Sequence, residues 1–485
     1  MNLKMVFNTL GNILKIEALL MLVPLSVALI YNEKMSVIAF LCVMALALAI
    51  GFLMTVFTRT KNNVIYAKEG FAIVALAWVA MSAIGAVPFV INGDIPSYID
   101  AFFEIASGFT TTGASILPDV EAVSKSGHMW RAFSHWVGGM GVLVFVMALL
   151  PNISERSIHI MRAEMPGPVV GKLVPKAKDT AKILYLIYIV MTILEMILLM
   201  FGEMNVYESV FHSFATAGTG GFGIKSDGLS SYSAYSQWII TIFMFLFGIN
   251  FNLYYLLLIG KAKAAFKSTE LWVYIGIVGA AVSVIAVNIY SLCGNIADTI
   301  RNAAFQVSSI ITTTGFATAD FNLWPDLSKA LLVLLMFIGG CAGSTAGGLK
   351  ISRVLLIFKV IGREIKQSLH PRSVNSVRLE GKTVEEKTAM GACVYFALYM
   401  VCILVIFVLL SLDSAAAGFD TNFTAAIACF NNIGPGIAKV GPMGGYAFYS
   451  PFSKVVLSFA MLLGRLEIYP LLLAFFPATW KKRCK

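Results

Sequence analysis

Four segments of the chain share a pattern of threonine, asparagine and glycine that could bind a dehydrated monovalent cation. Aligned from their first residues, the segments all have glycine at the fourteenth position; they are 100–115, 208–223, 302–317 and 421–436. Glycine reaches backbone angles that let consecutive carbonyl groups point toward a common axis. A ring of carbonyl oxygens can then replace the hydration shell of a cation. The predicted ion-binding residues are Thr111, Thr112, Gly113, Gly220, Gly221, Thr313, Thr314, Gly315, Asn432, Ile433 and Gly434.

Ordinary turns between helices are the alternative explanation for glycine-rich segments. One such segment would carry little weight in a chain with 40 glycines, but four in one register favour a shared function. The second segment reads Thr219-Gly220-Gly221-Phe222, which leaves open which of its glycines lies at the constriction. A carbonyl ring favours monovalent cations and by itself does not separate potassium from sodium.

A second unusual segment, residues 339–350, interrupts a long apolar stretch with several glycines. Glycine is costly inside a helix, so we expect a break here. We interpret this segment as a gating loop that lies below the cation site and blocks the path until it moves. The alternative is a small-residue motif that lets two helices pack closely. The predicted gate residues are Gly343, Ser344, Thr345, Ala346, Gly347 and Lys350.

Arg465 lies in the middle of the last apolar segment, where a charge costs about 2.5–3.5 kcal/mol on insertion scales. Our hypothesis is that it faces the pore, hydrogen-bonds loop carbonyls or an acidic neighbour, and sets a positive barrier that limits cation occupancy. The alternative is a buried structural ion pair. Glu467, two residues further on, points to another face of a helix and is a poor direct partner. Glu195 is a second intramembrane charge, with no partner identifiable from the sequence.

The elements that must position these residues are membrane-spanning helices. Hydrophobic residues make up 58% of the 485 residues, charged residues 13%, and the mean hydropathy is +0.82. This composition excludes a soluble globular protein. We expect no cleavable signal peptide, because the first apolar segment lacks a small-residue cleavage site. Segments long enough to span a bilayer lie near 13–31, 35–57, 70–91, 130–150, 183–202, 237–259, 271–293, 328–358, 389–412 and 453–476.

Lysine and arginine indicate how the spans are oriented. They gather at 59–68, 156–182, 261–267, 350–387 and the C-terminal end. With ten spans and a cytoplasmic N-terminus, all these segments fall on one side, as the positive-inside rule requires. We therefore expect both termini in the cytoplasm, and the four glycine-containing segments lie in the connections on the opposite side.

Each glycine-containing segment begins with about ten residues of helix-compatible sequence. A short helix that enters the membrane part-way and returns as extended chain is tolerated only where its backbone lines a wet cavity. The sequence thus predicts an all-α integral membrane protein with four helix–re-entrant pore loop–helix units around a central pore, preceded by an extra transmembrane helix pair. The expected boundaries are 1–69 for the helix pair and 70–180, 181–268, 269–385 and 386–485 for the four repeats, with the gating loop in the third.

At these residues the chain resembles the TrkH-type subunits of the Trk/Ktr/HKT superfamily of cation transporters. The resemblance rests on the TTTGA, TGGF, TTTGF and NNIGPG motifs, the extra helix pair and the last apolar segment with its arginine. It implies potassium as the transported ion, a bacterial inner membrane, and a homodimer with one pore in each protomer. It also implies a cytoplasmic TrkA-type subunit that binds nucleotides and gates the pore. In that family, glycine at all four filter positions goes with potassium conduction, whereas serine in the first loop accompanies sodium preference in some plant members; position 113 here is glycine.

Three other functions remain open on the sequence. A sodium- or proton-coupled potassium symporter would need a second ion site, for which Glu195 or Glu467 is the candidate. The second alternative is a sodium-permeable member of the same superfamily. An intramembrane enzyme would need a nucleophile with a base or a metal triad; His128 and His135 come with neither an HExxH motif nor a carboxylate triad. We expect a protein that is not an enzyme and that has no organic cofactor and no nucleic-acid partner.

Overall fold

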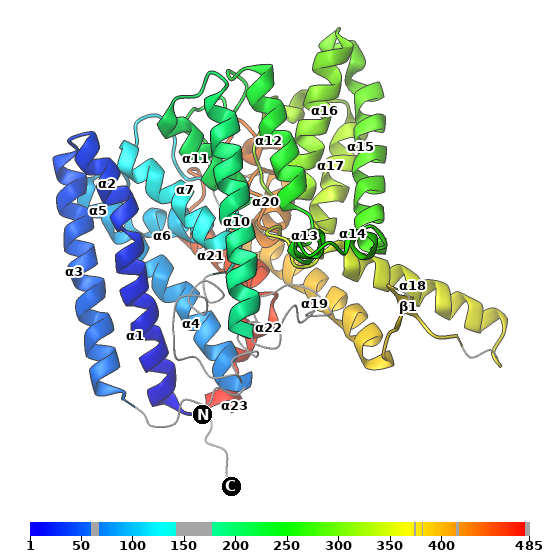
Figure 1. The fold of residues 1–485 in the computed structure, drawn as a ribbon, viewed down its shortest axis with the longest axis horizontal. Coiled ribbons are helices and arrows are strands. Elements are labelled where there is room, and N and C mark those ends of the chain that lie inside the picture. Colours follow the sequence, from blue (N-terminus) through cyan, green and yellow to red (C-terminus); the bar gives the residue numbers. More distant parts are fainter. Residues whose placement is uncertain (60–66, 142–176, 373–374, 381, 414–416, 481–485) are drawn as a thin grey trace.

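The structure, a computed structural model, describes residues 1–59, 67–141, 177–372, 375–380, 382–413 and 417–480 (Figure 1). By length and composition, six helices in these ranges could each cross a membrane, and one bent pair adds a seventh. The second half of the predicted span 130–150, most of the basic segments at 59–68 and 156–182, and the basic C-terminal end lie outside the described residues.

The extra helix pair stands at one edge of the molecule (Figure 1). Its first span is formed by α1 (Leu3–Leu20) and α2 (Leu22–Ile30) together, and its second span is α3 (Lys34–Phe57). Helices α1 and α3 pack closely where Gly11 and Gly51 face each other, since a Cβ built on Gly51 would lie 2.6 Å from the Gly11 carbonyl oxygen. The Glu33 carboxylate ties this pair to the first repeat by accepting the backbone N–H of Lys125 at 2.8 Å.

The segments predicted to form the first and second repeats each contain a 12-residue helix just before the shared glycine. The first repeat has α4 (Ala67–Gly85), α5 (Val87–Asn92), α6 (Tyr98–Phe109) and α7 (Lys125–Gly139). The second has α10 (Ala177–Met200), α11 (Val206–Ala217), α12 (Ala234–Phe247), α13 (Phe251–Leu258) and α14 (Ala262–Phe266). Helices α6 and α11 are the short helices, and serine or asparagine side chains cap their N-termini.

The predicted continuous span 237–259 is wrong, because α12 and α13 meet at an angle of 90°. The break falls at residues 248–250, and Asn250 caps the new helix by accepting the N–H of Asn252 at 2.9 Å. The carbonyl of Gly248, freed from the helix, accepts the N–H of Cys341 in the gating loop at 2.9 Å. Hydropathy alone does not register such a break, because the residues on both sides are apolar.

The third repeat has α15 (Thr269–Cys293), α16 (Ile296–Ile311), η2 (Phe321–Leu323), α17 (Asp326–Ile338) and α18 (Ile351–Leu369). The expected break in span 328–358 is present, since α17 ends before the gating loop and α18 begins after it. Helix α18 projects from the body of the molecule (Figure 1). It leads into a small antiparallel ladder of β1 (Arg378–Leu379) and β2 (Lys382–Thr383), which the sequence reading did not include.

The fourth repeat has α19 (Glu386–Ser411), α20 (Phe419–Phe430), η3 (Ala438–Val440), α21 (Pro451–Arg465), α22 (Tyr469–Phe475) and α23 (Pro477–Trp480). The predicted span 453–476 is broken at 466–468, where Glu467 and Ile468 have positive φ. An ion pair at 2.7 Å between Lys454 on α21 and Asp100 on α6 joins this repeat to the first. This pair places the predicted fourth repeat beside the predicted first one.

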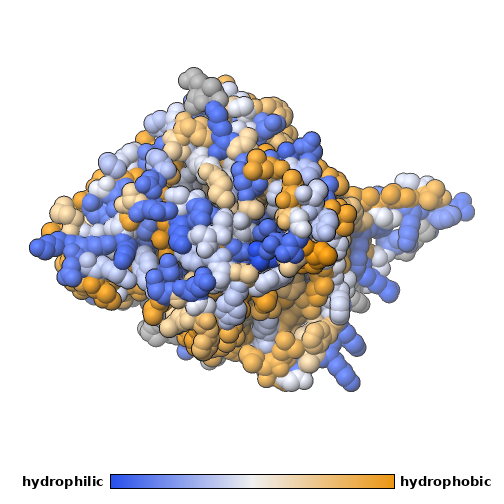
Figure 2. Space-filling model, turned by 90° about the horizontal axis from the view of Figure 1, so that it is seen from above, coloured by the Kyte–Doolittle hydropathy of each residue, from blue (hydrophilic) through white to orange (hydrophobic). Residues whose placement is uncertain are grey.

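The surface matches a protein in a bilayer. Seen from the end at the top of Figure 1, hydrophilic side chains are spread across the face, and hydrophobic ones dominate the lower edge of the view (Figure 2). Large apolar side chains are exposed along the long helices, for example Phe52 on α3 and Val287 on α15. Such outer faces suit contact with hydrocarbon.

Candidate ion filter and gate

The four predicted segments meet at the C-terminal ends of α6, α11, α16 and α20. A Cβ atom built on the glycine at position fourteen of each segment would lie 2.0–2.6 Å from a backbone carbonyl oxygen of the next segment. These contacts run from Gly113 to Gly220, from Gly221 to Thr314, from Gly315 to Ile433, and from Gly434 back to Thr112. The residue that carries each of these carbonyl oxygens directly precedes the position-fourteen glycine of its own segment. We call Gly113, Gly221, Gly315 and Gly434 the glycine ring.

The ring resolves the ambiguity in the second segment. Gly221 occupies the place of the other ring glycines, and Gly220 occupies the place of Thr112. All four ring glycines have φ between +74° and +93°. Because a side chain at any of them would collide with backbone, only glycine fits there.

The four short helices also end in the same way. In each, the residue before the ring glycine donates its N–H to a carbonyl five residues back, as in Thr112 to Ser107 at 2.9 Å and Thr314 to Ser309 at 2.8 Å. The residue one position earlier has left-handed φ between 53° and 57°; these residues are Thr111, Thr219, Thr313 and Asn432. This is the Schellman motif, in which glycine is usual. Thr219 was missing from the sequence prediction, although the alignment register places it with Thr111.

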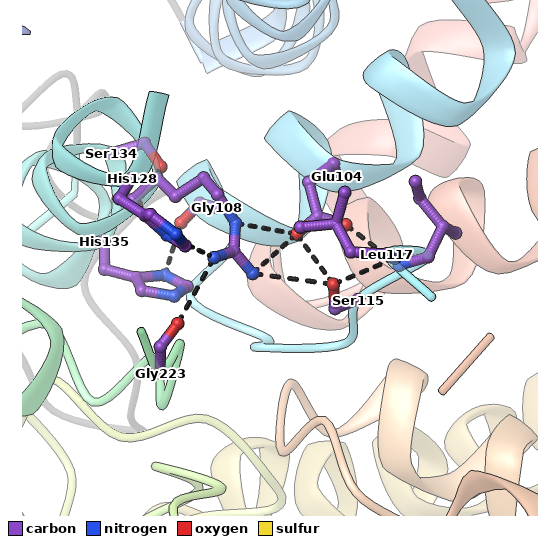
Figure 3. Close-up of polar contacts among 10 residues, drawn as sticks. Glu104, Gly108, Ser115, Leu117, His128, Ser134, His135 and Gly223 are labelled. Carbon is purple, nitrogen blue, oxygen red and sulfur yellow. Dashed lines mark hydrogen bonds and ion pairs between the residues drawn. The ribbon is translucent and has the colours of Figure 1, made fainter. Parts of the chain in front are cut away.

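A buried ion pair supports the first two loops (Figure 3). The Arg131 guanidinium lies 2.8 Å from the Glu104 carboxylate, and both side chains are at most 1% exposed. Glu104 also accepts the Ser115 hydroxyl at 3.0 Å, while Arg131 donates to the Gly223 carbonyl at 3.3 Å. Arg131 further lies over the Phe222 ring, 4.0 Å from its centroid. The pair thus fixes both loops just beyond the glycine ring, and sequence reasoning missed it.

The two histidines of α7 take part in the same packing. His128 Nδ1 lies 3.1 Å from Arg131 Nη1, and His135 Nδ1 lies 2.8 Å from the Gly108 carbonyl oxygen. Within the described ranges, no group of three or more His, Cys, Asp or Glu could hold a metal ion. These histidines therefore contact residues that support the first pore loop.

The spaces on the two sides of the glycine ring differ strongly. On one side lies a cavity of about 590 Å³, lined by all four ring glycines together with Arg131, Lys225, Lys439 and Tyr446. On the other side, a cavity of about 40 Å³ is lined by the gating loop and by Arg465 and Glu467. The cavity on the first side is therefore much larger than the cavity on the second.

The gating loop packs directly against the third and fourth pore loops. The Gly347 N–H donates to the Thr313 hydroxyl at 2.6 Å, and a Cβ on Gly347 would lie 2.5 Å from the Asn431 carbonyl oxygen. The buried Lys350 ammonium hydrogen-bonds the Ala346 carbonyl within the loop. The other predicted gate residues, Gly343, Ser344 and Thr345, lie in the same loop.

Glu270 at the start of α15 holds both ends of the gating loop. Its Oε1 accepts the N–H of Ala342 at 2.7 Å and that of Ser352 at 3.1 Å. The side chain is buried. This role could not be predicted from the sequence, because Glu270 lies at the start of an ordinary apolar helix.

Arg465 ends α21, rather than lying in the middle of a continuous helix, and donates to carbonyl groups from two elements. Its Nη1 lies 2.9 Å from the Thr345 oxygen, and its Nη2 lies 2.5 Å and 2.6 Å from the Gly138 and Gly139 oxygens. Arg465 thereby connects the gating loop to the end of α7. Glu467 pairs with Arg353 on α18.

Glu195 is fully buried on α10. Helix α10 packs against α11, the short helix of the second repeat, and Thr216 of α11 is near the Glu195 carboxyl group, whose two oxygens have no hydrogen-bond partner in the described part of the chain. Thr216 itself donates to the His212 carbonyl at 2.8 Å. A buried carboxyl group thus lies on the helix that packs against the short helix of the second segment.

Comparison with known proteins gives a consistent result. The sequence profile of the family described as TrkH, cation transport protein, matches residues 37–482. The Trk system potassium uptake protein TrkH of Escherichia coli K12 is 36% identical over 473 residues, which cover 95% of this chain and 96% of that protein. The Trk system potassium uptake protein TrkG of the same organism is 31% identical, with 99% of each chain covered. The crystal structure of the potassium transporter TrkH from Vibrio parahaemolyticus matches with a TM-score of 0.88 at 30% identity, covering 99% of this chain and 100% of that one.

Proposed function

This chain belongs to the TrkH family of cation transport proteins, and we propose that it conducts potassium across the membrane through a central pore whose filter is the glycine ring. It is a membrane transport protein and not an enzyme. The observation that carries the proposal is the ring itself, in which four segments of one chain place their glycines against one another's carbonyl groups.

In this proposal the backbone carbonyls of the filter residues replace the water around the ion. Carbonyl oxygens suit this task because they are neutral dipoles that bind a monovalent cation without trapping it. The C-terminal ends of α6, α11, α16 and α20 meet at the filter and add negative potential there. Glycine at all four ring positions is also the composition that the family resemblance associates with potassium.

We assign the gate to the gating loop. The cavity volumes of about 590 Å³ and about 40 Å³ support a path that is open as far as the filter and blocked beyond it. The cations Lys350 and Arg465 lie on the blocked side, where their charge opposes a passing ion. Opening would require the loop to move away from Thr313 and the Asn431 carbonyl.

A regulatory partner and a homodimer belong to the same proposal. The relatives are named as components of a Trk system, which supports assembly with other Trk proteins. We propose a cytoplasmic TrkA-type subunit that binds nucleotides and moves the gating loop. The projecting helix α18 carries exposed basic side chains such as Lys366 and offers a surface for this subunit. The positive-inside rule supports cytoplasmic termini in a bacterial inner membrane.

Rubidium uptake into liposomes that contain the purified chain tests the proposal. We expect uptake driven by a potassium gradient that competing sodium suppresses only weakly. A chain lacking residues 343–347 serves as the open-gate control. Uptake by this control alone would place the block at the gate, whereas absence of uptake by both proteins would reject the proposed pore.

Ion-coupled potassium symport is the second candidate, and buried Glu195 beside the second pore helix favours it. Glu467 is a weaker candidate for a coupling site because it is paired with Arg353. Symport predicts that uptake responds to an imposed sodium or proton gradient. Passive conduction predicts the same uptake with and without either gradient.

A further inference from the structure

The four carbonyl groups of the glycine ring are not equivalent. The Tyr446 hydroxyl donates a hydrogen bond of 2.7 Å to the Gly434 carbonyl oxygen. In the described part of the chain, no hydrogen bond reaches the carbonyl oxygens of Gly113, Gly221 or Gly315. One quarter of the ring is therefore held by a side chain.

Tyr446 has little freedom to leave this position. Its side chain is buried, and its backbone N–H donates to the Ser115 carbonyl of the first loop at 2.8 Å. Its ring packs against Phe103 of α6, with 5.6 Å between ring centroids, and against Tyr449 at 6.1 Å. The residue thus bridges the first and fourth pore loops at the wide side of the filter.

We propose that Tyr446 is a positioning residue that sets the discrimination between potassium and sodium by fixing the Gly434 carbonyl. This inference rests on the proposed function, because it assigns a role within that filter. A carbonyl oxygen that accepts a hydrogen bond from a hydroxyl uses one of its two lone pairs for that bond. The hydrogen bond also restricts the orientation of the carbonyl group. The smaller sodium ion needs the carbonyls to close around it, and a carbonyl oxygen anchored by a hydrogen bond resists that movement.

The test compares two tyrosine variants that each lose one hydroxyl. Tyr446→Phe removes the donor to Gly434 and keeps the aromatic ring. Tyr449→Phe is the matched control, since its hydroxyl is also buried but donates to the Asn422 side chain at 2.8 Å. The readout is the sodium concentration that halves rubidium uptake into liposomes. We expect sodium to inhibit Tyr446→Phe about two- to tenfold more strongly than wild type, the range that one neutral hydrogen bond supports, and Tyr449→Phe to match wild type.

The sodium concentration that halves uptake, compared between variant and wild type, distinguishes a positioning role of Tyr446 from an effect on folding. Loss of folded protein lowers total uptake and leaves the inhibiting sodium concentration unchanged. If Tyr446→Phe is poorly recovered, Tyr446→Met also lacks a donor and must show the same shift. Normal uptake with unchanged sodium inhibition in the Tyr446 variant, or an equal shift in Tyr449→Phe, rejects this inference alone. Absence of uptake by wild type and by the gating-loop deletion rejects the proposed function, and this inference with it.

Discussion

In each pore loop, two residues with positive φ are separated by one residue whose φ is not positive. Thr111, Thr219 and Thr313 adopt positive φ although they are β-branched, and the ring glycines two residues later do so again. A β-branched residue rarely takes this conformation, which costs about 1–2 kcal/mol for a residue with a Cβ atom. Two hydrogen bonds at the end of each short helix hold the conformation in place. The same strained conformation at equivalent threonines of three loops, with Asn432 in the fourth, points to a functional backbone.

Replacement of a ring glycine tests this backbone. In Gly315→Ala the new Cβ would lie 2.0 Å from the Ile433 carbonyl oxygen, at φ of +88°. We expect rubidium uptake to fall by more than about tenfold, because a shift costing about 1.4 kcal/mol at the filter already changes occupancy tenfold. The matched control is Gly276→Ala on α15, where a Cβ meets nothing within 4 Å. Equal uptake in the two variants would contradict the assignment of the filter.

The buried Glu104–Arg131 pair makes a separate prediction about stability. Glu104→Gln leaves the Arg131 charge buried without its carboxylate, and breaking such a pair costs about 3–5 kcal/mol. We expect a clearly lower unfolding temperature in detergent. Glu386→Gln removes a carboxylate from the exposed pair with Arg363 and is expected to change the unfolding temperature little. Similar melting of the two variants would mean that the buried pair contributes no more than a surface pair.

The ring glycines could be predicted from the sequence because only glycine fits beside a neighbouring carbonyl group at these positions. It did not predict the Glu104–Arg131 pair, because pairing depends on how α6 and α7 are placed in space. A hint was nevertheless present, since both charges fall in segments otherwise expected to lie within the membrane. Tyr446 gave no such hint, as tyrosine is common at membrane interfaces.

At the scale of elements, breaks in two other helical segments lie beside the gating loop. The break between α12 and α13 leaves the Phe247 and Gly248 carbonyls free to accept N–H groups of the loop. The break between α21 and α22 follows directly after Arg465. Non-helical backbone inside a membrane protein must find such internal partners. The loop is therefore held by backbone contacts that a modest movement of α12 or α21 would alter.

Deletion of residues 343–347 tests the loop as a gate. The deletion removes the contacts of Gly347 with Thr313 and of Thr345 with Arg465. We expect basal rubidium uptake to rise several-fold, because nothing then fills the narrow side of the filter. Size-exclusion chromatography checks that the shortened protein remains folded. Unchanged basal uptake by a folded deletion protein would reject the gate and favour a helix-packing role.

At the scale of the whole molecule, one chain closes a ring from four unequal repeats. The ion pair between Asp100 and Lys454 joins residues 354 positions apart and links the first repeat to the last. The extra helix pair lies outside the ring and contacts the first repeat through Glu33. Closure depends on the fourth repeat reaching back to the first.

A charge exchange tests this closure. Lys454→Asp places two carboxylates together where a pair at 2.7 Å now lies, and we expect reduced uptake and a lower unfolding temperature. The double variant Asp100→Lys with Lys454→Asp restores opposite charges and is expected to recover much of both. Failure of the double variant to improve on the single one would show that the attraction between the two groups does not hold the repeats together.

The arrangement of long helices and four pore loops was predictable because hydropathy and the shared glycine position are properties of whole segments. Hydropathy reports whether a stretch can lie in a membrane, and this was sufficient for the long helices α3, α15 and α19. It does not report direction, so hydropathy predicts continuous spans where the structure has the 90° turn after α12 and the break before α22. The break before α18 was predictable because glycine itself signals it.

The closed ring of four unequal loops also has a genetic consequence. In a pore assembled from four identical subunits, one changed codon alters every side of the filter at once. Here each quarter of the ring has its own codons, so one mutation at Gly113, Gly221, Gly315 or Gly434 changes a single side. Under the proposed assignment of the ring as the filter, natural variation can therefore adjust ion preference one loop at a time. Each loop can also acquire its own support, as Tyr446 provides for Gly434.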